Sequence, residues 1–192
     1  MGLFRNKHED SNEAGSIGVM EKRDGTDRRS SVATVERYMM QQEMLSMGDD
    51  YWIETQTGEK TLKVNGKAAR ARDTFLLEDR HGNEVLKIQE RAASLRDTMK
   101  IERTDGGDAI VHKAAVGVRD RFIVSVTGEP DIHAQGNIVG RSYNISQDGH
   151  TIGRVSKEWF KFRDTYGVEV EAGADTALVL AITVCLDSMS RW

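Results

Sequence analysis

The stretch LLEDRHGNEVLKIQERAASLRDT, residues 76–98, decides the fold because the chain uses its pattern four times. Apolar residues come first, Gly82 follows, alternating apolar residues resume, and the stretch closes with a basic residue and then Arg96, Asp97 and Thr98. Alternation on both sides of a glycine is typical of a β-hairpin. Because one hairpin is too small to bury its own apolar face, we expect the copies to pack on one another.

Three further copies occupy residues 52–74, 101–121 and 143–165, each with a glycine at nearly constant distance before its closing arginine. Turn signals of the same kind recur between them. The region therefore contains about twelve predicted short strands, and their spacing indicates an antiparallel meander. Residues 38–47 are ambiguous, since Met, Gln and Glu favour a helix, whereas the strands that follow favour a strand; we prefer a strand. The repeat glycines are Gly58, Gly82, Gly106 and Gly149.

The C-terminal region breaks this rhythm. Asp175 is a natural N-cap for the apolar run 176–186, and the next charge is Asp187. The run is shorter than the roughly 20 residues that a transmembrane helix needs, and a helix that is apolar on every side belongs inside a protein. The sequence therefore predicts a mainly β fold, a closed antiparallel barrel of about twelve strands around a central hydrophobic helix at about residues 175–189.

Residues 1–34 differ from the rest of the chain. They are rich in Arg, Asp, Glu, Ser and Gly and have no sustained apolar period. We expect a flexible polar N-terminal tail there, followed by one domain over residues 35–192. The tail has no apolar stretch of the kind that a secretory signal requires.

The composition is that of an ordinary soluble protein, with 38% hydrophobic residues, 30% charged residues and a net charge of -4 in 192 residues. A nucleic-acid-binding protein would usually carry a basic balance, so we expect no nucleic-acid partner. Cys185 is the single cysteine. No intramolecular disulfide can form, and a reducing compartment, the cytoplasm, is expected.

Several short segments stand in an order and spacing that are specific when taken together. They are GDDYWI at 48–53, LLED at 76–79, LRDT at 95–98, GNI at 136–138, VSK at 155–157, RDTYGV at 163–168 and ALVLA at 177–181. This series resembles the LURP-one-related family over residues 35–189. The family is similar in fold to the tubby C-terminal domain and to phospholipid scramblases, so the resemblance implies a twelve-stranded barrel around a central hydrophobic helix.

The resemblance implies less about function. Tubby domains bind phosphoinositide head groups through basic residues, and scramblases are linked to lipid movement and calcium, whereas LURP-one-related proteins are mostly uncharacterised. The acidic calcium segment of scramblases is only partly similar to residues 164–171 here. In that stretch Val168 and Val170 alternate with Glu169 and Glu171, as in a strand with one wet face. We therefore expect no calcium site.

The densest basic cluster contains Lys67, Arg70 and Arg72, with no acidic residue among them. Such a cluster suits an anionic lipid head group or another anionic ligand, although a solvated rim is the more ordinary interpretation. The closing Arg-Asp pairs of the repeats also have two interpretations. They form either a ring of arginines that binds phosphate, or a recurring turn in which Asp holds the backbone and Thr begins a strand. Repetition favours the second.

No enzyme motif is present. The sequence has no nucleophile elbow, no phosphate-binding loop and no His-Glu-x-x-His. Its histidines lack paired metal spacing, His81 and His150 stand in or beside turns where we expect them exposed, and Cys185 is expected to be a buried apolar residue. We predict a non-catalytic protein with no cofactor and no metal, cytoplasmic and, where it binds anionic phospholipid, peripheral at the membrane. The alternatives are a protein-interaction scaffold or an enzyme with a small pocket at a barrel end.

Overall fold

The computed structural model of the protein describes residues 35–41, 51–67, 74–91, 98–114, 121–159 and 165–190. In these residues the chain forms twelve β-strands followed by one α-helix. In chain order the elements are β1 (Glu36–Gln41), β2 (Tyr51–Thr55), β3 (Lys60–Lys67), β4 (Thr74–Glu78), β5 (Glu84–Glu90), β6 (Thr98–Arg103), β7 (Ala109–Lys113), β8 (Arg121–Val126), β9 (Ile132–Asn137), β10 (Ser142–Gln147), β11 (His150–Ser156), β12 (Thr165–Val170) and α1 (Thr176–Met189).

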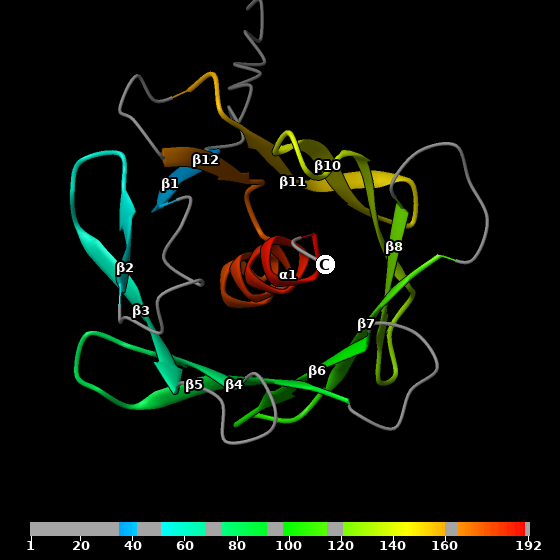
Figure 1. The fold of residues 1–192 in the computed structure, drawn as a ribbon, viewed down its shortest axis with the longest axis horizontal. Helices are drawn as coiled ribbons and strands as arrows, with labels where there is room; N and C mark the ends of the chain where they lie inside the picture. Colours follow the sequence, from blue (N-terminus) through cyan, green and yellow to red (C-terminus); the bar gives the residue numbers. More distant parts are fainter. Residues whose placement is uncertain are drawn as a thin grey trace, which may run out of the picture. The chain divides into compact units, whose positions relative to one another are not determined.

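The strands form a closed antiparallel barrel. Each strand pairs with the next one along the chain, and β1 pairs with β12 from Glu36 opposite Val170 to Gln41 opposite Thr165. Closure gives a partner to the backbone groups that an edge strand would leave unpaired. Figure 1 shows the strands as a ring that encloses α1. The predicted barrel of about twelve strands around a central helix is confirmed.

The four sequence repeats overlap with the hairpins β2–β3, β4–β5, β6–β7 and β10–β11, whose first strands begin one to three residues before each repeat. The repeat glycine of every hairpin lies in the turn with a φ between 78° and 90°, a left-handed conformation that other residues adopt only with strain. In β2–β3, β4–β5 and β10–β11 the register shifts close to this turn. Such a shift adds a residue to one strand and increases its local twist. The sequence repeat therefore reflects a recurring hairpin turn with a glycine in the left-handed conformation.

The strand preferred for residues 38–47 is confirmed as far as Gln41, where β1 ends. Residues 42–47 lie outside the described part of the chain. So do residues 1–34, and the predicted division into a tail and a domain stays a prediction.

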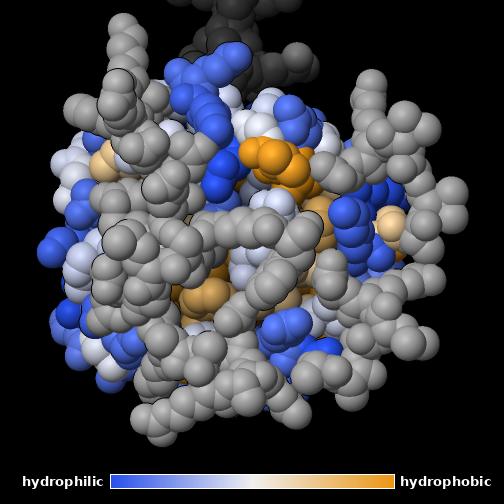
Figure 2. All heavy atoms as spheres, in the orientation of Figure 1, coloured by the Kyte–Doolittle hydropathy of each residue, from blue (hydrophilic) through white to orange (hydrophobic). Residues whose placement is uncertain are grey.

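Helix α1 occupies the barrel interior because nearly all of its surface is apolar. Asp175 caps it as predicted, since its carboxylate accepts a hydrogen bond from the backbone N–H of Leu178 at 3.0 Å. Every residue from Leu178 to Met189 is buried. The wall comes very close at Gly153 of β11, where an added Cβ would lie 2.8 Å from Cγ1 of Val179. Figure 2 shows apolar side chains toward the centre of the ring and hydrophilic ones around it.

Strand β12 corrects one expectation from the sequence. Val168 and Val170 are buried, as their alternation predicts, but Glu169 is only 7% exposed and does not lie on a wet face. Its carboxylate accepts a hydrogen bond from Nε of Arg37 at 2.7 Å and lies 3.7 Å from Nη1 of Arg154. These arginines come from the two neighbouring strands and cover the outer face of β12. Alternation within one strand cannot reveal such a cover.

The antiparallel order gives the barrel two different ends. At the turn end, the even-numbered strands end and six short described turns follow them, the last one leading into α1. At the opposite end, the odd-numbered strands end. Helix α1 therefore begins at the turn end and runs toward the opposite end, where its last turn lies beside the turn 138–141.

Candidate functional site

The repeat brings four basic residues to the opposite end of the barrel. Lys67 ends β3, Arg91 follows β5, Lys113 ends β7 and Lys157 follows β11. These strands run in the same direction, so their ends share one rim. Arg91, Lys113 and Lys157 are exposed, whereas the side chain of Lys67 lies outside the described part of the structure.

The predicted cluster of Lys67, Arg70 and Arg72 is therefore placed only in part. The backbone of Lys67 lies at the end of β3, whereas Arg70 and Arg72 lie outside the described residues. The binding role of the three residues stays a prediction.

The closing triplets of the repeats also lie at the opposite end. The third residue of each triplet begins a strand, as the turn interpretation predicts, and the strand starts are Thr74, Thr98, Arg121 and Thr165. The arginine and the aspartate that precede each of them lie outside the described residues.

The turn end has the opposite charge. Its six turns, residues 56–59, 79–83, 104–108, 127–131, 148–149 and 171–175, contain one arginine, Arg80, and nine acidic residues. The acidic residues are Glu59, Asp79, Asp105, Asp108, Glu129, Asp131, Asp148, Glu171 and Asp175. Charges of one sign at one end of a barrel create a potential there that attracts cations and repels anions.

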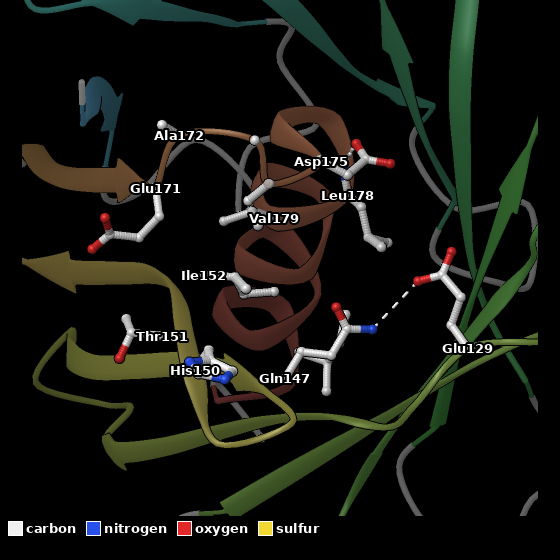
Figure 3. Close-up of a pocket in the computed structure, with 13 residues that line it drawn as sticks. Glu129, Gln147, His150, Thr151, Ile152, Glu171, Ala172, Asp175, Leu178 and Val179 are labelled. Atoms are coloured by element: carbon white, nitrogen blue, oxygen red, sulfur yellow. Dashed lines mark hydrogen bonds between the residues drawn. The ribbon is translucent and has the colours of Figure 1, made fainter. Parts of the chain in front are cut away.

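A cavity of about 440 Å³ opens at the turn end, between the first turn of α1 and the hairpin β10–β11. Its apolar lining includes Ile152 from β11 and Leu178 and Val179 from α1, and carboxylates stand among the residues around it (Figure 3). The acidic lining residues are Glu129, Glu171 and Asp175. No lysine or arginine is among the described residues that line the cavity.

The three carboxylates differ in how far they are already engaged. Asp175 uses both oxygens, one for the N–H of Leu178 and the other for Nη1 of Arg103. Glu171 accepts a hydrogen bond from Nη1 of Arg154 at 3.0 Å. Glu129 accepts a weaker one of 3.3 Å from the amide of Gln147, drawn as a dashed line in Figure 3. Glu129 thus faces no cationic side chain in the described contacts of this cavity.

A buried ion pair holds the other end of α1. Nη2 of Arg141, in the turn 138–141, lies 2.6 Å from Oδ1 of Asp187, whose side chain is only 4% exposed. The Arg141 guanidinium also lies over the ring of Tyr166, 5.3 Å from its centre. Burial first, and the Asp187 charge second, hold the pKa of Tyr166 and that of Tyr143 well above their usual range. These tyrosines are therefore neutral packing partners of the pair.

The described residues give little support to catalysis. Burial raises the pKa of the Cys185 thiol, and the residue is fully buried, so the reactive thiolate is disfavoured. His81 and His150 are exposed, as predicted. In the part of the chain that the structure describes, no group of three or more His, Cys, Asp or Glu side chains could hold a metal ion.

The length and hydropathy of α1 indicate whether it could cross a membrane. No helix within the described ranges is both long enough and apolar enough to span a bilayer.

Sequence reasoning did not find the cavity or the ion pair. The cavity lining comes from segments as far apart as Glu129 and Val179, which meet only when the barrel closes. The one feature of the sequence that could have pointed to the cavity is the excess of acidic residues in the turns that contain glycine. For the ion pair, Asp187 was noted only as the charge after the apolar run, although the helix continues past it to Met189.

Three comparisons bear on the family. A model of the LURP-one-related family matches residues 36–187. The fold is similar to the X-ray structure of a protein from Arabidopsis thaliana, with 14% sequence identity, a TM-score of 0.59, and coverage of 83% of this chain and 93% of that chain. At this identity the likeness shows the fold alone. No curated protein sequence matches the chain significantly.

Proposed function

The chain belongs to the LURP-one-related family, and from this premise we propose that it is a non-catalytic binding protein whose opposite end docks on an anionic lipid surface. The family is not a known enzyme family. In this proposal Lys67, Arg70 and Arg72 contact the lipid head groups, and the protein is cytoplasmic and peripheral at a membrane.

The observation that carries the proposal is the separation of charge along the barrel. Counted together with the strand ends at this end of the barrel, the turns of the turn end contain twelve acidic residues and three basic ones, Lys60, Arg80 and Arg103. At the opposite end the described basic residues outnumber the acidic ones. The basic ones are Lys67, Arg91, Lys113, Arg121, Arg141 and Lys157, and the acidic ones are Glu90, Glu158 and Asp187.

This separation orients the molecule in front of an anionic surface. Each Lys or Arg near such a surface contributes about 1 kcal/mol, and the effect decays within a Debye length of about 10 Å. The acidic turn end is repelled by the same surface. The barrel therefore approaches end-on, with the C-terminal end of α1 toward the lipid.

Vesicle sedimentation tests the proposal. The full chain is mixed with vesicles of phosphatidylcholine alone or of phosphatidylcholine with phosphatidylserine, at low and high salt. We expect binding to the anionic vesicles only, weakened by salt, and largely lost in the triple variant Lys67→Ala, Arg70→Ala, Arg72→Ala.

A matched triple variant controls for net charge. Lys60→Ala, Arg80→Ala, Lys87→Ala removes the same charge from the turn end and the barrel wall, and it should bind like the wild type. Equal loss in both triple variants would leave no role for the opposite end. Absence of salt-sensitive binding by the wild type would refute lipid docking altogether.

A further inference from the structure

We propose that the cavity at the turn end is a second binding site, specific for a small aliphatic amine in its protonated form. This inference does not depend on lipid docking, which concerns the other end of the barrel. It starts from the size of the cavity, about 440 Å³, which is within the roughly 300–1,000 Å³ typical of small-molecule sites.

The lining of the cavity selects for an aliphatic body. Leu178 and Val179 are held in place as the first turn of a helix that is buried along the rest of its length. Ile152 packs against the same core and is itself only half-buried, so part of its surface is available to a ligand. Val179 is fully buried and Leu178 is only 4% exposed, so among these three residues Ile152 offers most of the apolar surface that an alkyl chain can remove from water. The protein need not rearrange, because the site is already formed.

The charges around the cavity select for a cation. Glu129, Glu171 and Asp175 line it, and Arg103 and Arg154 offset the charges of Asp175 and Glu171 only from outside the lining. Glu129 has an amide partner and no cationic one among the described contacts. The remaining acidic residues of the turn end add a field of the same sign. An anion would find no lysine or arginine in the lining, and the N-terminus of α1, which favours a negative charge, is already capped by the Asp175 carboxylate.

Figure 3 shows how the apolar residues and the carboxylates of the cavity are arranged. In this view Glu129 and Asp175 lie on the same side of α1 with Leu178 between them, whereas Ile152 and Val179, which line the same cavity, lie on the side of Glu171 and Thr151. An alkylammonium ion can therefore place its chain on Leu178 and Ile152 and its ammonium group at the Glu129 carboxylate. Hydrogen bonds to a charged group are stronger than those between neutral groups, so the ammonium gives specificity and the alkyl chain gives contact area.

Three probes of equal length test the inference: hexylamine, hexanol and hexanoate, titrated into the isotopically labelled full chain at neutral pH. Hexylamine is a cation under these conditions, as lysine is. We expect it to shift the amide resonances of Leu178 and Val179, with hexanol binding about tenfold more weakly and hexanoate not at all. Equal binding of hexylamine and hexanoate, or no shift with hexylamine, would overturn the inference.

Two variants in the same turn distinguish binding at the cavity from a general attraction of cations to the acidic turn end. Glu129→Gln should weaken hexylamine binding about tenfold, whereas Asp131→Asn, in the same turn but outside the lining, should leave it nearly unchanged. Equal losses in both variants would reduce the effect to the field of the turn end and contradict a defined site. Vesicle binding should be the same in both, so failure here is distinguishable from failure of lipid docking.

Discussion

The two ends of α1 are held by the same chemistry in opposite surroundings. At the turn end Arg103 of β6 pairs with Asp175, whose side chain is 38% exposed. At the opposite end Arg141 pairs with Asp187, whose side chain is 4% exposed. The helix dipole favours a carboxylate at its N-terminus and disfavours one near its C-terminus. Asp175 is therefore stabilised by its position alone, whereas Asp187 depends on its arginine.

The contribution of an ion pair to stability therefore depends on how far the pair is buried. Exposed pairs contribute between zero and about 1 kcal/mol. Breaking a buried pair by removing one partner costs about 3 to 5 kcal/mol, because the remaining charge stays out of water. The turn end, with its exposed pairs and open cavity, can accept a ligand at little structural cost, whereas the buried pair fixes the position of α1 in the barrel.

The largest expected effect comes from Arg141→Met. This change removes the guanidinium and leaves the Asp187 carboxylate buried, so we expect the free energy of unfolding to fall by about 3 to 5 kcal/mol in urea titrations followed by circular dichroism. The double variant Arg141→Met, Asp187→Leu should recover most of the loss, since it leaves no buried charge. If the double variant is as unstable as the single one, packing of Arg141 on Tyr166 is the dominant contribution instead.

The next effect comes from Asp175→Ala at the other end of the helix. It removes the acceptor for the Leu178 N–H and should cost about 1 kcal/mol in the same measurement. Asp175→Asn keeps an acceptor in the same place and serves as the control. A cost as large as that of Arg141→Met would contradict the difference that we draw between the two ends.

A smaller effect is expected for Arg103→Met. The pKa of Arg103 is raised, mainly by its hydrogen bonds to Asp105 and then by Asp175, which shows that the charged form is favoured there. The pairs are half-exposed, so we expect a loss below about 1 kcal/mol that shrinks further at high salt. A salt-independent loss would show that the aliphatic part of the side chain matters more than its charge.

The smallest expected effect is an acid dependence that arises at the turn end. Hydrogen bonds from the side chain and backbone of Asn83 lower the pKa of Asp79, and Arg103 and Lys100 lower those of Asp105 and Asp108. A lowered pKa means that the unfolded state binds protons first. The stabilisation is complete above the usual aspartate pKa of about 4 and is lost as the pH falls below it.

Urea midpoints measured from pH 5 downward test this direction. Asp79→Asn should flatten the decline, whereas Glu158→Gln, which removes an exposed carboxylate at the opposite end, should leave it as steep as in the wild type. A decline that begins well above the usual aspartate pKa, or one that Asp79→Asn does not alter, would assign the acid sensitivity to other groups.

The sequence alone determined the local structure of this protein. The repeat glycines set where the chain turns, the alternation of Phe122, Val124 and Val126 indicates which face of β8 is buried, and the apolar run after Asp175 forms the central helix. These properties depend on neighbours within a few residues. The exposure of Glu169 was predicted wrongly, because Arg37 and Arg154 reach its carboxylate from the two neighbouring strands.

The residues that lie together at each end of the barrel could not be predicted from the sequence, because they meet only in the folded barrel. The chain runs in opposite directions in neighbouring strands. Basic residues such as Lys113 and Lys157 therefore lie at one rim of the barrel, and the acidic turns lie at the other. The pairing of Arg141 with Asp187, and the presence of Glu129 and Leu178 around one cavity, follow from the packing of α1 inside the barrel. Contacts of this kind join residues that no sequence period relates, and so the folded barrel alone brings them within reach of one another.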